Sequence, residues 1–135
     1  MIVVDASVLV TALADDDDAG DRTRARLAVA AGTGEQLVAP ELVALEVLSA
    51  LRRLVADGRV PPRRATLSVA DLIDLPLLRA PHGPLLSRCW ELRDNLTPYD
   101  AAYVALAEAL TAPLLTGDER LANAPGVRCA IELLR

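Results

Sequence analysis

Short apolar runs alternate with longer helical segments along the whole chain, and this alternation constrains the fold more than any other feature. The apolar runs predict strands at 2–4, 36–39, 75–80, 113–116 and 127–133. The segments between them predict helices at 6–14, 19–31, 40–56, 61–74, 83–95, 97–111 and 119–123. Strands that alternate with helices form a parallel sheet covered on both faces, so the sequence predicts an α/β fold.

The length and hydrophobicity of the chain suit one compact domain. Its 135 residues are 53% hydrophobic, and we expect residues 1–135 to form a single domain around one core. No apolar stretch approaches the ~20 residues that a membrane helix needs, because Asp, Arg or Pro interrupts each one. Residues 1–5 carry no basic side chain of the kind that begins a signal peptide. We therefore expect a cytoplasmic protein without a membrane partner.

The charged and metal-binding residues exclude several classes of enzyme. All 14 bases are arginines, which excludes a Walker A loop, a Schiff-base lysine and a Ser–Lys pair. His82 is the single histidine, and Cys89 and Cys129 form neither a zinc motif nor a disulfide framework. The net charge of −5 disfavours a protein that coats nucleic acid by bulk charge. It leaves open a nuclease whose small acidic pocket holds a metal ion.

Four acids stand in apolar surroundings where acids are rare. Asp5 and Asp118 each follow a predicted strand, while Glu46 and Asp100 lie in apolar helical segments. Ligands of parallel sheets bind beyond the carboxyl ends of the strands, which is where Asp5 and Asp118 are expected. A carboxylate in dry surroundings must be paired, hydrogen-bonded, protonated or bound to a metal.

Each of the four acids also has a structural interpretation. Asp5 and Asp118 could be helix N-caps, because each precedes a helix. The segment 97–100 resembles a capping box that would account for Asp100. For Glu46, the alternative is a place on an exposed helical stripe.

These structural interpretations weaken if the four acids converge. At ~5 Å spacing, each ionised pair repels by about 3 kcal/mol at an effective dielectric near 20. A divalent cation would relieve this repulsion, and carboxylate oxygens favour Mg²⁺ or Mn²⁺ over zinc. Such a metal polarises a phosphoryl oxygen and lowers the pKa of a bound water.

The chain resembles the PIN-domain ribonucleases, specifically the VapC toxins of bacterial type II toxin–antitoxin modules. The resemblance covers essentially the whole chain and rests on the segments 2–7, 39–53, 96–108 and 113–121. The third segment is the most specific of the four. The resemblance implies a PIN-like three-layer sandwich, in which a parallel sheet of about five strands is flanked by helices on both faces.

The resemblance also implies the roles of individual residues. The acidic quartet of the family falls on Asp5, Glu46, Asp100 and Asp118, the four acids already selected. Ser7 and Thr116 match positions that support the site through hydrogen bonds, and Arg93 matches a frequent basic position. Tyr99 is a candidate for stacking on an RNA base, whereas we expect Tyr103 to pack in the core.

We therefore expect a Mg²⁺-dependent endoribonuclease that acts as a toxin, with Mn²⁺ as a substitute metal. Asp5, Asp100 and Asp118 are expected closest to the metal, with Glu46 bound directly or through water. A metal-activated water would hydrolyse the RNA phosphodiester bond. The alternative is a catalytically inactive PIN-fold module that only binds antitoxin or RNA. A dehalogenase-like phosphatase is disfavoured, because Ser7 stands where its second Asp is needed and no lysine is present.

The expected partners are RNA, a second copy of the chain and a VapB-type antitoxin. The last two follow from the resemblance, which implies homodimers and inhibition by a cognate antitoxin. An acidic pocket favours a cationic segment, so we expect the antitoxin to place an Arg among the four acids. Glu41 and Glu46 would point about 140° apart on one helix, and we expect Glu46 to face the site.

Overall fold

A five-stranded parallel sheet forms the centre of the computed structural model, which describes residues 1–135. The strands are β1 (Ile2–Val4), β2 (Leu37–Pro40), β3 (Leu77–Ala80), β4 (Leu114–Thr116) and β5 (Ile131–Leu133). Their order is β3-β2-β1-β4-β5, and every neighbouring pair is parallel. The central strand β1 is fully buried, as its β-branched sequence predicts.

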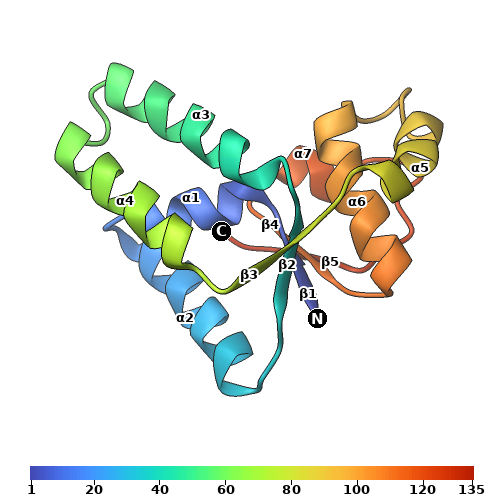
Figure 1. The fold of residues 1–135 in the computed structure, drawn as a ribbon, viewed down its shortest axis with the longest axis horizontal. Helices are drawn as coiled ribbons and strands as arrows, with labels where there is room; N and C mark the ends of the chain where they lie inside the picture. Colours follow the sequence, from blue (N-terminus) through green and yellow to red (C-terminus); the bar gives the residue numbers. More distant parts are fainter.

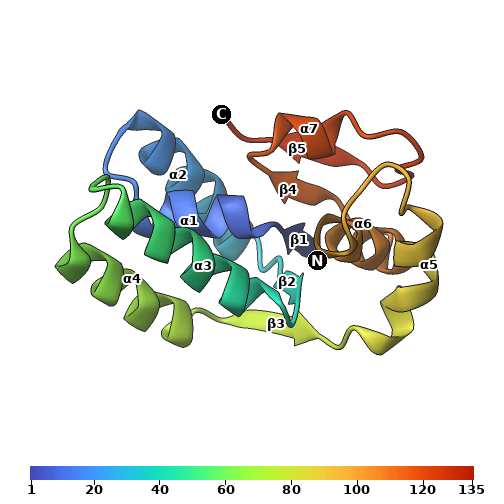
Figure 2. The same cartoon turned by 90° about the horizontal axis from the view of Figure 1, so that it is seen from above.

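Helices cover both faces of this sheet, which confirms the predicted three-layer architecture. The helices are α1 (Ala6–Ala14), α2 (Asp18–Gly32), α3 (Val43–Ala56), α4 (Pro62–Asp74), the 3₁₀ helix η1 (Gly83–Leu85), α5 (Leu86–Glu91), α6 (Pro98–Leu110) and α7 (Glu119–Ala122). Figures 1 and 2 show α1 to α4 on one side of the sheet and α5 and α6 on the other. None of these helices combines the length and the apolarity needed to cross a bilayer.

Three predicted boundaries differ from the structure. Helix α3 begins at Val43 rather than residue 40, because Pro40 stays in β2 opposite Ala80. The predicted helix 83–95 begins as the 3₁₀ helix η1, continues directly into α5 and ends at Glu91, followed by turns at 92–95. Strand β5 is shorter than the predicted 127–133, because the Arg128 N–H donates to Glu108 Oε1 instead of pairing with a strand.

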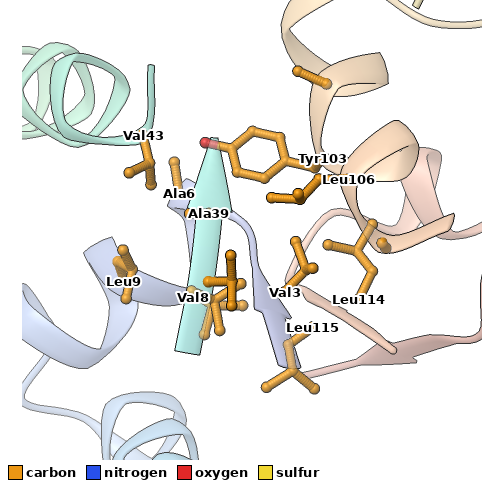
Figure 3. Packing of buried hydrophobic residues seen from close by; sticks show 14 of the residues in the cluster. Val3, Ala6, Val8, Leu9, Ala39, Val43, Tyr103, Leu106, Leu114 and Leu115 are labelled. Carbon is orange, nitrogen blue, oxygen red and sulfur yellow. The ribbon is translucent and has the colours of Figure 1, made fainter. Parts of the chain in front are cut away.

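The core packs on both faces of β1 and β2. Tyr103 of α6 is its largest fully buried side chain, in agreement with its predicted place in the core. Figure 3 shows the ring beside Leu106 and Ala39, with its hydroxyl pointing toward Ala6 and Val43. In this orientation the Tyr103 ring lies in the core, and its hydroxyl oxygen points from α6 toward α3.

The order of the strands places a crevice between β1 and β4. The chain runs outward from β1 through β2 to β3, then returns to the other side of β1 with β4 and β5. Such a reversal leaves an opening at the carboxyl ends of the two central strands. Asp5 follows β1 there, and Asp118 follows β4.

Candidate active site

The structure brings the four predicted acids to one cavity. Asp5, Glu46, Asp100 and Asp118 line the same cleft of about 640 Å³. They come from the end of β1, from α3, from α6 and from the end of β4 respectively. Residues up to 113 positions apart therefore meet at the crevice that the sheet topology creates.

Asp5 is the most buried of the four and is held by two hydroxyls. Its side chain is 7% exposed. Thr116 Oγ1 and Ser7 Oγ donate to Asp5 Oδ2 at 2.7 and 3.0 Å. Burial raises the pKa of Asp5, and the charge of Asp100 adds to the increase, while both hydroxyls oppose it. Asp5 occupies the N-cap position of α1, as the structural interpretation expects, but its carboxylate makes no cap hydrogen bond to the helix.

The two hydroxyls also fix the turn that follows β4. Ser7 Oγ accepts from the Gly117 N–H at 3.0 Å, and Thr116 Oγ1 accepts from the Asp118 N–H at 3.0 Å. Each hydroxyl thus donates to Asp5 and accepts from the turn. Ser7 and Thr116 make the hydrogen bonds expected of them, and these bonds join the ends of β1 and β4.

Glu46 is half-buried in the first turn of α3 and is bound by the buried tyrosine. Tyr103 Oη donates to Glu46 Oε1 at 2.6 Å. Burial raises the pKa of Glu46, and the charges of Asp5 and Asp100 raise it further, whereas the Tyr103 hydrogen bond lowers it. The pKa of the Tyr103 hydroxyl is raised by burial and by this contact.

The surroundings of Glu46 differ from those that the sequence predicts. Leu45 is 71% exposed, so the apolar neighbours in sequence do not enclose Glu46. Tyr103, which is 57 positions away, faces it instead. Glu41 lies in the turn before α3, is exposed and does not line the cavity. Of the two glutamates, Glu46 is the one that faces the cleft, as expected.

Asp100 and Asp118 share one arginine. Arg120 Nη2 donates to Asp100 Oδ2 at 2.8 Å and to Asp118 Oδ2 at 3.1 Å. The other oxygen of Asp118, Oδ1, accepts from the Arg120 and Leu121 N–H groups, so Asp118 is the N-cap of α7 as well. Thr97, not Asp100, caps α6, which leaves the Asp100 carboxylate for Arg120. The sequence reasoning missed Arg120, although a base two positions after a candidate ligand is a visible signal.

The donor chemistry of the cavity fits a hard divalent cation, but the side chains are not gathered around one point. No three His, Cys, Asp or Glu side chains lie close enough together to hold a metal ion. Asp5 is turned to hydroxyls, Glu46 to Tyr103, and Asp100 and Asp118 to Arg120. All available donors are carboxylate oxygens, which suit Mg²⁺ or Mn²⁺, and the charges of Asp5, Glu46 and Asp100 already act on one another.

The two residues suggested for RNA binding lie outside this cavity. The Arg93 guanidinium lies 4.7 Å from the centre of the Trp90 ring and donates to the Trp90 carbonyl at 3.0 Å. Tyr99 is 63% exposed and lines a separate apolar pocket with His82. Neither side chain therefore lines the cleft that holds the four acids.

Other charged side chains line the cavity instead. Arg53 and Arg59 lie along it together with Asp57 and Asp15. Asp15 belongs to the acidic run 15–18, which the sequence predicts to be a solvated loop. That interpretation is only partly correct, because Asp17 caps α2 and Asp16 pairs with Arg64. The cavity therefore has an acidic end at the sheet and a mixed end between α1 and α3.

A family model and several known proteins match this chain. The model described as PIN domain matches residues 2–127. Ribonuclease VapC1 of Mycobacterium tuberculosis is 44% identical over 134 residues, which are 98% of this chain and 97% of the relative. The match to VapC1 therefore extends over nearly the full length of both proteins.

Solved structures show the same fold at lower identity. VapBC2 from Rickettsia felis, solved with a DNA fragment from its promoter, has a TM-score of 0.71 at 16% identity and covers all of both chains. Mycobacterium tuberculosis VapC20, described as a Sarcin-Ricin loop cleaving toxin, has a TM-score of 0.66 at 18% identity and covers 95% of this chain and 99% of its own. These two likenesses concern the fold alone.

Proposed function

The chain belongs to the PIN-domain family and, within it, to the VapC ribonucleases, and from this premise we propose that it is the toxin of a type II toxin–antitoxin module. It acts as one domain in the cytoplasm and hydrolyses RNA phosphodiester bonds. The observation that carries the proposal is the convergence of four carboxylates from four elements on one cavity. His82 lines another pocket, where its Nε2 accepts from the Leu42 N–H, so it does not compete as a base in this cavity.

The proposed cofactor is Mg²⁺, with Mn²⁺ as a substitute. Asp5, Asp100 and Asp118 would hold the ion, with Glu46 as a direct or water-mediated ligand. When bound, the ion polarises the phosphoryl oxygen and activates the attacking water. Its binding is favoured because a cation offsets the repulsion among the carboxylates, which adds to burial in raising the pKa values of Asp5 and Glu46.

The residues around the acids orient them for this role. Both hydroxyl bonds to Asp5 fall on Oδ2, so Oδ1 is the oxygen left for a ligand. Tyr103 likewise occupies Glu46 Oε1 and leaves Oε2 to accept a proton from water. A carboxylate with a raised pKa is a stronger base, which suits this proton transfer.

One observation favours the alternative of an inactive binding module. Arg120 pairs with two of the four carboxylates. These two therefore have an ionic partner without any metal, as acids with a purely structural role would. The two functions differ in metal binding. Titration with Mn²⁺ followed by calorimetry should show binding to the toxin, and the absence of binding would favour the inactive module.

The proposed protein partners are a VapB-type antitoxin and a second copy of this chain. The acidic cavity, in a protein of net charge −5, is complementary to a cationic antitoxin segment that inserts an Arg. The proposed dimer face is the apolar surface around Leu86 and Tyr99, which line one pocket and are 61% and 63% exposed. Light scattering on wild type and Leu86→Glu tests this face, since the substitution should give a monomer.

The RNase activity has a direct test. The purified chain should cleave RNA with Mg²⁺, and EDTA should stop the reaction. Sequencing the RNA ends produced on brief induction in cells would identify the RNA and the cleaved bond. Intact RNA in both experiments would contradict the proposed function.

A further inference from the structure

Arg120 occupies a place in the cavity that the proposed reaction does not explain. A single atom, Nη2, contacts both Asp100 and Asp118, at 2.8 and 3.1 Å. These two carboxylates are proposed ligands of the metal ion. No other arginine forms an ion pair with any of the four acids, although Arg53 and Arg59 line the same cavity.

The electrostatics of the metal-free cavity account for this contact. Four carboxylates around one cavity repel one another, and this repulsion opposes folding unless a cation is present. The four side chains line one cleft, and Asp100 and Asp118 lie close enough together to contact the same nitrogen atom. Asp100 and Asp118 are the pair that Arg120 neutralises.

The geometry also shows how Arg120 could leave. Its backbone is fixed, because the Asp118 carboxylate accepts from the Arg120 N–H at 2.9 Å. Its side chain is 63% exposed and is held by one nitrogen, rather than by the paired nitrogens of a bidentate contact. Exposed pairs of this kind are weak, so a divalent cation can displace the guanidinium without unfolding α7.

We propose that Arg120 is the resident counter-ion of the cavity, which holds Asp100 and Asp118 when no metal is bound and must swing out before a divalent cation can bind there. This inference rests on the proposed metal-dependent function. It gives Arg120 a positioning role toward the carboxylates, not a catalytic one. It also accounts for the orientation of Asp100 and Asp118, which are turned to the guanidinium while it is in place.

The test compares Mn²⁺ binding to wild type and to Arg120→Gln by calorimetry. Removing the competing cation should tighten Mn²⁺ binding by about 1.5- to 5-fold, the range expected for an exposed ion pair. The matched control is Arg135→Gln, because Arg135 makes an exposed ion pair with Glu119 of the same helix and touches none of the four acids. This control should bind Mn²⁺ as wild type does.

Thermal unfolding separates a counter-ion from a merely structural residue. Without metal, Arg120→Gln should melt below wild type, because Asp100 and Asp118 lose their partner. With saturating Mn²⁺ the difference in melting temperature should disappear. The ion then takes the place of the guanidinium in wild type, and it is the partner of Asp100 and Asp118 in both proteins. A structural role would lower the melting temperature equally with and without Mn²⁺, and that result would overturn the inference.

The remaining outcomes distinguish this inference from the proposed function. If wild type binds no Mn²⁺, the metal-dependent function itself fails. If wild type binds Mn²⁺ and Arg120→Gln binds it equally or more weakly, the counter-ion role alone fails. Should Arg120→Gln not fold, ¹⁵N NMR of wild type replaces it: Mg²⁺ should shift the Arg120 side-chain signals and leave those of Arg135 in place, and unmoved Arg120 signals would refute the displacement.

Discussion

The molecule contains two clusters of arginine and carboxylate, and they are built in opposite ways. At the far side of the sheet, Arg88 donates to both oxygens of Glu108, at 2.7 and 3.1 Å. The Gly126 carbonyl accepts from Arg88, and the Arg128 N–H donates to Glu108. At the cavity, one exposed guanidinium pairs through one nitrogen with two of the four carboxylates, Asp100 and Asp118.

The pKa values follow this difference. Burial alone would raise the pKa of Glu108, but the hydrogen bonds from Arg88 and the Arg128 N–H outweigh it and lower the pKa. The pKa values of Asp5 and Glu46 are raised, because burial and neighbouring negative charges outweigh their hydroxyl partners. A satisfied carboxylate stabilises the fold, whereas an undersatisfied group of carboxylates is suited to binding a cation. Four experiments test whether the two clusters really differ in this way.

The largest expected effect is on catalysis, from Asp100→Asn at the cavity. The substitution keeps the shape of the side chain and removes one proposed metal ligand. RNA cleavage should fall by at least about 100-fold, as when a transition-state contact is lost. Circular dichroism should show an unchanged fold, since relief of repulsion offsets the lost pair with Arg120. The control is Asp94→Asn, an exposed acid outside the cavity, and near wild-type cleavage by Asp100→Asn would contradict the metal mechanism.

The next effect is on stability, from Glu108→Gln in the other cluster. Breaking this well-shielded pair leaves Arg88 with only the exposed Glu91 as an ionic partner, so the free energy of unfolding in urea should fall by about 2 kcal/mol. The folded variant should still cleave RNA at the wild-type rate. Glu119→Gln is the control, because it breaks an exposed pair with Arg135 and should cost less than about 0.5 kcal/mol. Equal losses of unfolding free energy in Glu108→Gln and Glu119→Gln would show that the shielded pair is no stronger than the exposed one.

A smaller effect concerns Mn²⁺ affinity and separates two glutamates near α3. Glu46→Gln should weaken Mn²⁺ binding by about 10-fold, because it removes a ligand or the partner of a bound water. Glu41→Gln should leave the affinity unchanged, since Glu41 is exposed and lies outside the cavity. Calorimetry on both variants decides the matter, and a larger loss for Glu41→Gln would reverse the assignment.

The smallest effect is a difference of sign in the pH dependence of stability, measured in EDTA. The pKa of Glu46 lies above its ordinary 4.5, so ionising it costs stability as the pH rises through the folded pKa. Glu46→Gln should therefore gain stability over wild type as the pH rises. The pKa of Glu108 is lowered from 4.5, so its contribution is present above that value and is lost as the pH falls. Urea unfolding of both variants between pH 3.5 and 7.5 should give opposite slopes.

Much of the site can be predicted from the sequence, because its signals are local. Asp5 and Asp118 follow strands, and strand order alone brings the ends of β1 and β4 together. Glu46 and Asp100 are acids in apolar helical segments. The topology of an α/β sheet then predicts that such acids meet at one edge.

What the sequence misses depends on contacts between distant segments. Tyr103 reaches Glu46 only because α6 packs beneath β2, and no local pattern encodes that hydroxyl. Arg120 contacts Asp100 only because α7, which begins after its N-cap Asp118, brings the Arg120 side chain to α6. Arg93 is matched to a basic position of the family and Tyr99 flanks Asp100 in the sequence, but neither signal tells which cavity a side chain lines.

The position of β4 beside β1 also determines at what stage of its synthesis the protein becomes toxic to the cell. Val3 pairs with Leu114, so the middle of the sheet is closed by a strand synthesised more than a hundred residues after its neighbour. At about 5–20 residues per second, the ribosome has nearly finished the chain before Asp118 exists to complete the cavity. Such long-range pairing also folds slowly. A nascent or truncated chain therefore lacks the assembled site, and toxicity arises only once the whole protein has been made.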